Sequence, residues 1–483
     1  MALFDTENLM KGTLGKLNEI ITGGDENTQA NINNFISWCT PGIPFTSEDF
    51  NFLTKGLSGS TGEETRSLIK NAALFSMFID LVPDPTAIYK TDQGQTLDRN
   101  SQERLSKIYE NILQFAKISN LEPTESERIK IEKFRNLLSK TIEVPDLVDD
   151  TKKSYRIEYG PVKQLYNQYE KAYNDALYLY NNARISALTA ANSEAVLNFM
   201  LNGPILLANV NSANDEWEAN GYKSTVNDME TYISQVTNRS MSIWFSHLKD
   251  IFNIASNNLD PTTGQKFCPS FLYPSSFVNN PDWPAFNFHE SECETHSSKS
   301  SNAWGGSASL NLGLWRFGAN AGVQNEKENQ SFQSSTYKMS FKIAMVKILR
   351  PWLGSELFSC GGWNLEPGTW QFGSCQLSDG GNPPIGNFIA YSTHAIFVKD
   401  LVVEFDKSSW ESSSLKKSIN AGGNVGWGPF NLGGSYKKNE ETHDFKAQDT
   451  GSGFSCEGMQ LIGFINRKVG KTPNPSPNAK FDN

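Results

Sequence analysis

Apolar residues recur at helical spacing through much of the first half of the chain. After the helix-capping sequence Thr61-Gly-Glu-Glu64, the side chains of Leu68, Ala72 and Phe75 fall on one helical face. Because proline disrupts a helix, Pro83 marks the end of this element. The same spacing predicts further helices over about residues 7–21, 101–119 and 124–141.

A longer helical pattern covers about residues 160–255. Its apolar seam alternates steps of four and three residues, which is the spacing of a coiled coil, and passes from tyrosines to alanines. We expect Asn202-Gly203-Pro204 to break or kink the first helix and its partner to begin near Ser212. This predicts a long antiparallel helical hairpin with arms of roughly 40 residues. Within it, the apolar stretch Ala187–Val210 is interpreted as a buried core helix rather than a membrane-inserting one.

The pattern changes near residue 260. Helical spacing stops there, and apolar residues begin to alternate with polar ones, as from Ser307 to Leu314. We therefore predict an α+β protein with a helical domain over residues 1–260 and a duplicated, sandwich-like antiparallel β domain over residues 261–470. The Pro-rich residues 471–483 are expected to form a flexible tail.

The β-rich half contains an internal repeat, with units of about residues 268–350 and 386–468. The first Gly-rich segment, Trp304–Phe332, and the second, Ala421–Phe445, align without gaps from Gly313 and Gly426 onward. Each follows a Ser-rich charged link and precedes an apolar run, so each unit predicts strand, link, Gly-rich hairpin and strand. Because glycine weakens strands, these hairpins are expected to be only weakly fixed in one conformation.

Composition and charge narrow the classes of function. The chain has 483 residues, a formal net charge of −10 and an isoelectric point near 5.2. This acidic composition provides no excess of positive charge for binding nucleic acid, and we expect no nucleic-acid partner. The sequence shows neither a secretory signal nor a window approaching the ~20 apolar residues of a membrane-spanning helix. We expect the chain to be cytoplasmic on synthesis, with release by lysis or non-classical export.

Motifs of ordinary enzymes are missing from the sequence. It contains no H-E-x-x-H, P-loop, G-x-S-x-G elbow or dinucleotide fingerprint after a strand, so we expect neither enzymatic activity nor a cofactor. In an acidic link, His289, Cys293 and His296 are weak metal candidates, although a solvated link is the favoured interpretation. Cys360 and Cys375 bracket a predicted hairpin, and whether they form a disulfide depends on the compartment.

Two amphipathic Gly/Ser-rich hairpins with charged tips are what a β-barrel pore former requires. One face of each strand would meet lipid and the other water, and closing a barrel between subunits would pair every strand edge. A helical portion with two such hairpins loosely resembles large pore-forming toxins, including the perforin-like type. That type has an aromatic-Gly-Thr-His-aromatic core followed by Gly-Gly. This chain has Tyr391-Ser-Thr-His394-Ala395 without the Gly-Gly pair, so no family is assigned.

We therefore expect a soluble, oligomerising, membrane-active protein of pore-forming-toxin character. Its expected partners are further copies of itself and membrane lipid, while a receptor or glycan is left open. The alternatives are a self-assembling structural protein that forms rings, tubes or filaments, and a carbohydrate- or lipid-binding module that uses exposed tryptophans. The membrane or intersubunit contact is expected at Gly305, Gly306, Leu310, Leu312, Gly313, Leu314, Trp315, Phe317, Gly422, Gly423, Val425, Gly426, Trp427, Phe430, Gly433 and Gly434.

Overall fold

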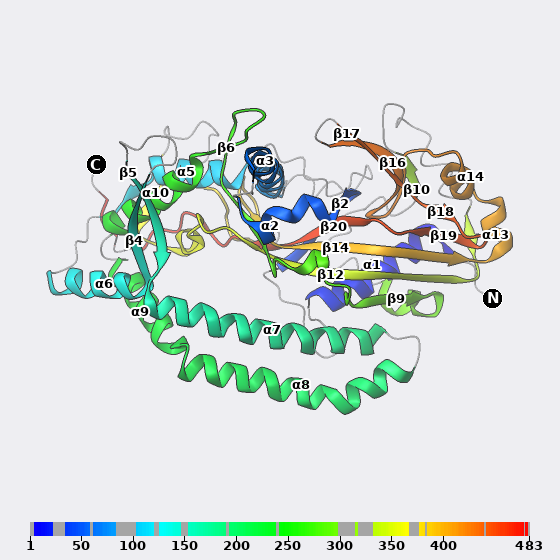
Figure 1. Ribbon diagram of the computed structural model, residues 1–483, viewed down its shortest axis with the longest axis horizontal. Coiled ribbons are helices and arrows are strands. Elements are labelled where there is room, and N and C mark those ends of the chain that lie inside the picture. Colours follow the sequence, from blue (N-terminus) through cyan, green and yellow to red (C-terminus); the bar gives the residue numbers. More distant parts are fainter. Residues whose placement is uncertain are drawn as a thin grey trace. The chain divides into compact units, whose positions relative to one another are not determined.

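The computed structural model describes residues 4–22, 34–57, 61–83, 103–119, 125–145, 153–189, 193–237, 241–297, 314–316, 332–366, 376–381, 384–438, 441–477 and 479–481 (Figure 1). The fold contains both helices and antiparallel sheets, so the predicted α+β class is confirmed. The chain divides into two compact units. Unit 1 comprises residues 1–115, 248–359 and 367–473, and unit 2 comprises residues 116–247, 360–366 and 474–483.

The centre of unit 1 is an eight-stranded antiparallel sheet. Its four longest strands lie side by side in the order β2 (Asn34–Phe45), β20 (Met459–Lys468), β14 (Ala390–Phe405) and β12 (Tyr337–Leu349) (Figure 1). The other edge of β12 pairs with β8 (Phe271–Tyr273) and β9 (Ala285–His289), while β14 also pairs with β19 (Gly453–Cys456), which in turn pairs with β18 (Gln448–Asp449). In chain order, β9, β12, β14 and β20 thus form a meander in which each strand pairs with the next.

Different helices pack on the two ends of this sheet, as the pattern of buried side chains along β12 shows. In the first half of the strand the odd-numbered residues, such as Tyr337 and Phe341, are buried in a core that includes helix α1 (Thr6–Thr22). In the second half the even-numbered residues, such as Val346 and Ile348, are buried in a core that includes helix α3 (Gly62–Ile79). Since successive side chains of a strand point to opposite faces, α1 and α3 pack on opposite faces of the sheet.

The division into compact units differs from the predicted domain boundary near residue 260. Strand β2 pairs with β20, and Asn466 of β20 donates a hydrogen bond of 2.8 Å to Ser37 Oγ of β2, across 429 positions of sequence. Leu9 and Leu17 of α1 belong to the core of the same sheet. The first 115 residues therefore lie in one compact unit with the strands. Local periodicity does not reveal this arrangement, because it carries no information on distant partners.

Several helices begin where their local signals predict. Thr61 Oγ1 accepts a hydrogen bond of 3.1 Å from the backbone N–H of Glu64, which confirms the predicted cap of α3. Helices α5 (Leu105–Phe115) and α6 (Glu125–Leu138) lie within the predicted ranges. Helix α7 (Pro161–Thr189) begins close to the predicted residue 160, with Pro161 in its first turn.

Unit 2 is largely helical, and α7 and α8 (Ser193–Ala219) run alongside one another (Figure 1). Trp217 of α8 is buried against Tyr166 and Tyr173 of α7, with ring centroids 5.1 and 5.4 Å from the indole. Unit 2 also contains α9 (Lys223–Thr237), the pair β4 (Ser139–Pro145) and β5 (Lys153–Tyr159), and the pair β3 (Lys117–Ile118) and β13 (Trp363–Asn364). Helix α10 (Met241–Ser256) contributes residues to both units.

Two predictions about this region are wrong. The helical hairpin does not turn at Asn202-Gly203-Pro204, since Pro204 lies inside α8, which continues to Ala219 past the position near Ser212 where the second arm was expected to begin. Pro204 is exposed, so water can hydrogen-bond to the carbonyl that the missing proline N–H leaves unpaired. The stretch Ala187–Val210 is not a buried core helix either, because Met200 and Leu201 of α8 are 69% and 66% exposed.

The C-terminal residues have defined contacts, in contrast to the flexible tail expected from their composition. In unit 1, Thr472 is fully buried, and its hydroxyl donates a hydrogen bond of 2.6 Å to the carbonyl of Phe358. In unit 2, the N–H of Ser476 donates to the carbonyl of Gly361 at 2.8 Å. Backbone and side-chain hydrogen bonds thus fix a segment that its prolines alone would leave open.

Candidate functional site

The second Gly-rich segment forms most of a four-stranded antiparallel sheet in unit 1. Strand β15 (Val425–Trp427) turns at Gly428-Pro429 into β16 (Phe430–Lys438), which pairs with β17 (Glu441–Lys446). Gly428 has a φ of +53°, a conformation that favours glycine, and a Cβ at this position would lie 2.6 Å from Sδ of Met10. The turn is therefore seated tightly against helix α1.

The apolar contact residues predicted in this segment face the protein core. Val425, Trp427 and Phe430 are at most 1% exposed. The Trp427 ring packs against Tyr337 and Phe405 of the central sheet, with centroids 5.7 Å apart in both cases. Of the predicted glycines, Gly426 and Gly433 are buried, Gly423 and Gly434 are half-buried and Gly422 is exposed. Contact with lipid or another subunit through the apolar residues thus requires a rearrangement.

Only part of the first Gly-rich segment is described. Strand β10 (Leu314–Arg316) pairs antiparallel with β15, which places Leu314 opposite Trp427 and Trp315 opposite Gly426. Leu314 and Trp427 also occupy equivalent positions in the alignment of the two segments, so the pairing brings equivalent residues face to face. The other predicted residues of this segment lie outside the described residues: Gly305, Gly306, Leu310, Leu312, Gly313 and Phe317.

Both Gly-rich segments leave the central meander at the same end. Strand β9 ends at His289 and β12 begins at Tyr337, and His289 pairs with Lys338. Strand β14 ends at Phe405, which pairs with Tyr337. The first segment is therefore inserted between the neighbouring strands β9 and β12, and the second between the neighbouring strands β14 and β20. Sequence periodicity finds the segments but does not show that they share this end.

The weak metal candidates do not gather into a site. Glu292 accepts a hydrogen bond of 3.0 Å from the backbone N–H of His289 and forms an ion pair of 2.6 Å with Lys16 of α1. Cys293 is buried, and His296 lies in the short helix α11 (Cys293–Ser297). In the part of the chain that the structure describes, no three His, Cys, Asp or Glu side chains are placed to hold a metal ion. The acidic link instead ties the start of the first insertion to α1.

The stretch Tyr391-Ser-Thr-His394-Ala395 lies in β14 and has a structural role there. Arg350 Nη1 donates to the carbonyl of Ser392 at 2.5 Å, and Nη2 donates to its hydroxyl at 2.9 Å. Thr393 Oγ1 lies 3.1 Å from His394 Nδ1 and donates to the carbonyl of Ile465 in β20 at 3.2 Å. Burial, together with the nearby charge of Lys347, lowers the pKa of His394 to about 4.

Because the pKa of His394 is lowered, we expect the protein to lose stability in mild acid. The unfolded chain takes up a proton below about pH 6.5, whereas folded His394 stays neutral down to about pH 4. The contribution of neutral His394 to the free energy of unfolding is therefore complete above pH 6.5. It is lost as the pH falls towards 4, which lowers the free energy of unfolding by about 3 kcal/mol. Urea unfolding at about pH 7.5 and about pH 4.5 should show a smaller loss for His394→Gln than for the wild type. Equal losses in the two proteins would contradict the prediction.

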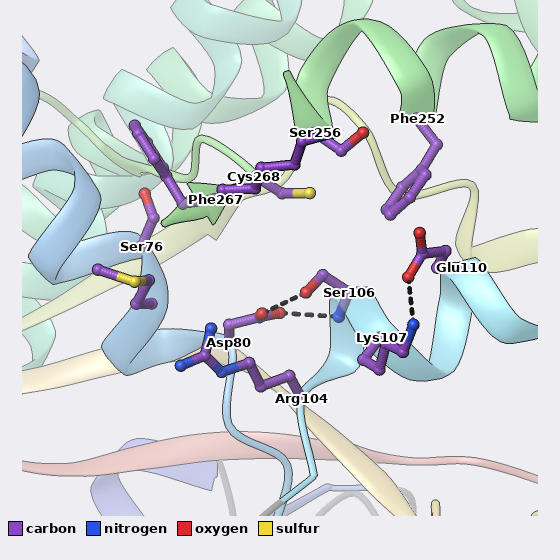
Figure 2. A pocket seen from close by; sticks show the side chains of 12 residues that line it. Ser76, Asp80, Arg104, Ser106, Lys107, Glu110, Phe252, Ser256, Phe267 and Cys268 are labelled. Atoms are coloured by element: carbon purple, nitrogen blue, oxygen red, sulfur yellow. Dashed lines mark hydrogen bonds and ion pairs between the residues drawn. The ribbon is translucent and has the colours of Figure 1, made fainter. Parts of the chain in front are cut away.

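A cavity of about 260 Å³ in unit 1 is another candidate site (Figure 2). Ser76 and Asp80 line it from the C-terminal end of α3, Ser106 and Glu110 from α5, and Phe252 from α10, with Cys268 following β7 (Lys266–Phe267). These positions come from distant parts of the sequence and share no motif. No sequence pattern therefore marks the cavity in advance.

The polar groups of this cavity hold the fold together. The Asp80 carboxylate accepts hydrogen bonds from the Ser106 N–H at 2.8 Å and from its hydroxyl at 2.5 Å, and so caps α5 (Figure 2). Burial raises the pKa of Asp80, while Ser106 and the charges of Arg350 and Arg104 oppose this shift. Burial, with the carboxylates of Asp80 and Glu110, raises the pKa of the Cys268 thiol to about 12. The thiol therefore stays protonated at neutral pH and is a poor nucleophile.

Comparison of the chain with protein families, curated proteins and solved structures finds no match. Within the described ranges, none of the helices combines the length and apolar character needed to cross a bilayer. Support for a function therefore comes from the fold and the arrangement of the Gly-rich segments.

Proposed function

We propose that this chain is an oligomerising, membrane-active protein of pore-forming character. The observation that carries the proposal is the common exit of both Gly-rich segments from one end of the β9–β12–β14–β20 meander. If each insertion extended as a hairpin, it would continue strand pairs that already exist: β9 with β12, and β14 with β19, which precedes β20. Four adjacent strands would result, and no pairing among the four meander strands would have to change.

The insertions are long enough for such hairpins. Residues 290–336 separate β9 from β12, and residues 406–458 separate β14 from β20. Each insertion could supply two strands of roughly 20 residues, whereas a tilted membrane strand needs about 10. Because open strand edges are unfavourable in lipid, neighbouring copies would close the barrel, and the proposal therefore includes a homo-oligomer.

The compact packing of the second insertion opposes this extension. Trp410, Leu415, Trp427 and Phe430 are buried in the core of unit 1, and burial of each such side chain contributes about 1.5–3 kcal/mol. Extension would be favourable only where lipid and neighbouring subunits replace these contacts. We accordingly propose that the compact form precedes membrane contact and that rearrangement takes place at the bilayer surface.

Two finer features of the fold belong to the same proposal. We propose that the Gly-rich segments are parts of duplicated units and that α7 and α8 form an antiparallel hairpin. The pairing of Leu314 with Trp427 supports the first, and the packing of Trp217 on α7 supports the second. The units differ in detail. The Phe-Val pair upstream of the first Gly-rich segment, Phe277-Val278, lies in a short 3₁₀ helix, whereas the pair upstream of the second, Phe397-Val398, lies in β14.

A self-assembling structural protein is the second candidate. Strand β17 is the outer strand of the sheet β10-β15-β16-β17, and an outer strand of this kind can pair with another chain. A glycan-binding module is less well supported. Of the five tryptophans it would use, Trp363 and Trp427 are fully buried, and Trp304, Trp315 and Trp370 have no described side chain.

Negative-stain electron microscopy of one preparation, alone and with liposomes, tests these functions against one another. We expect rings that appear only on the liposomes, because closure of the barrel needs lipid. Tubes or filaments formed without lipid would favour the structural candidate and contradict the pore. Single particles indifferent to lipid would contradict both and favour glycan binding.

A further inference from the structure

Helix α8 carries an apolar face that is exposed. Its members are Met200, Leu201, Ile205 and Leu207, which are 69%, 66%, 59% and 42% exposed. Leu201 and Ile205 are neighbours four positions apart on the helix surface. The exposed Pro204 lies three positions from Leu201 and from Leu207 and four from Met200, and so joins these side chains into one surface. We call these four side chains the α8 apolar face. Aliphatic side chains gathered in this way mark a binding surface, whereas exposed apolar residues scattered singly do not.

The stretch that carries this face has no charge. From Ala195 to Asn214 the sequence contains no Asp, Glu, Lys, Arg or His. The nearest charged residues along the helix are acidic, with Glu194 before the stretch and Asp215 and Glu216 after it. No ionic group within the stretch is available to steer or orient a protein partner.

We propose that the α8 apolar face binds the interface of a neutral, zwitterionic bilayer. This inference rests on the membrane-active character proposed above, but it assigns the first membrane contact to a surface outside the Gly-rich segments. Aliphatic side chains gain free energy on leaving water without needing a directional partner. Because α8 does not qualify as a membrane-spanning helix, it would lie in the plane of the interface, with Trp217 turned towards α7.

A second copy of the chain fits this face less well than lipid does. The central anchors of protein interfaces are enriched in tryptophan, tyrosine and arginine, and the α8 apolar face has none of these. Each copy also has a formal net charge of −10, which opposes association unless opposite charges meet, and this stretch offers no charge for that purpose.

The same charges select the kind of lipid. Asp215 and Glu216, which are exposed, follow the face along α8, and an anionic leaflet would repel them. Phosphatidylcholine vesicles should therefore bind the protein, and added phosphatidylserine should weaken this binding. Salt should have little effect on binding to phosphatidylcholine, because burial of apolar surface provides the affinity.

Vesicle flotation with these two lipid compositions tests the inference. The wild type should float with phosphatidylcholine vesicles, and Met200→Gln/Leu201→Gln/Ile205→Gln should lose about 100-fold in partition. The matched control is Ile129→Gln/Leu259→Gln/Ile385→Gln, at residues that are 61%, 52% and 72% exposed elsewhere on the chain. It should float as the wild type does. Both variants should keep the wild-type melting temperature, since the replaced side chains are exposed.

The outcomes separate this inference from the proposed function. Failure of the wild type to float, equal flotation of the α8 variant or stronger flotation with phosphatidylserine would overturn the inference. Unchanged leakage of vesicle contents by the α8 variant would then leave the pore proposal intact. A wild type that floats but releases no contents would leave the inference standing and contradict the pore. A third outcome is that the wild type and the control variant sediment as dimers, the α8 variant sediments as a monomer, and all three proteins float equally. This outcome would assign the face to a second copy of the chain and overturn lipid binding.

Discussion

A disulfide between residues 10 and 428, in the variant Met10→Cys/Gly428→Cys, is expected to abolish leakage of lipid vesicles until a reductant is added. A Cβ at Gly428 would lie 2.6 Å from Sδ and 2.9 Å from Cγ of Met10, so the two new sulfur atoms would occupy the space that the methionine vacates. The bond would hold the turn between β15 and β16 against α1. Because the second insertion could not then extend, the proposed barrel could not form.

Each single variant is a control for this experiment. Met10→Cys and Gly428→Cys should leak with and without reductant. Gly428→Cys also reports the cost of a side chain at positive φ, about 1–2 kcal/mol, together with the cost of displacing the Met10 side chain. Mass spectrometry under non-reducing conditions should verify the intended bond, because Cys293 also lies close to α1. Flotation should be unchanged, since the α8 apolar face is untouched. Leakage at the wild-type rate by the fully oxidised double variant would contradict extension of the second insertion.

Replacing Trp427 with alanine is expected to lower the free energy of unfolding by about 3–5 kcal/mol. The side chain is fully buried, with ring centroids 5.7 Å from those of Tyr337 and Phe405 and 6.1 Å from that of Phe454. Its indole N–H is buried without a hydrogen-bond partner in the described structure. This unpaired group offsets part of the stability that burial of the ring contributes. Trp427→Phe removes that N–H and keeps an aromatic ring, so urea titration should show a smaller loss than for alanine.

The alanine variant should also leak faster than the wild type. If the second insertion must leave the core before it enters the bilayer, weaker packing lowers the barrier to that step. The matched control is Trp352→Ala, because Trp352 is 1% exposed in unit 1 but lies outside both insertions. It should lose comparable stability without faster leakage at a temperature where both variants are folded. If both variants leak faster by the same factor, the faster leakage results from general instability. That result would count against a specific release of the second insertion from the core.

The sequence by itself determined the α+β class and the features with local causes. The cap of α3 depends on a hydrogen bond between residues three positions apart, and the start of α7 depends on the fixed φ of Pro161. These signals need no knowledge of distant partners. The similarity of the two Gly-rich segments is also a property of the sequence alone.

The tertiary structure alone decided which segments meet and which side chains are buried. Strand β2 joins the central sheet through β20, near the other end of the chain, so composition could not place the boundary between the compact units. Trp427 is buried and Leu201 is exposed, although both belong to apolar stretches. Pro204 remains inside a helix because the packing of Trp217 on α7 helps to stabilise α8 against the local cost of proline. Burial and strand pairing are set by what packs against a segment, and this information lies outside the segment's own sequence.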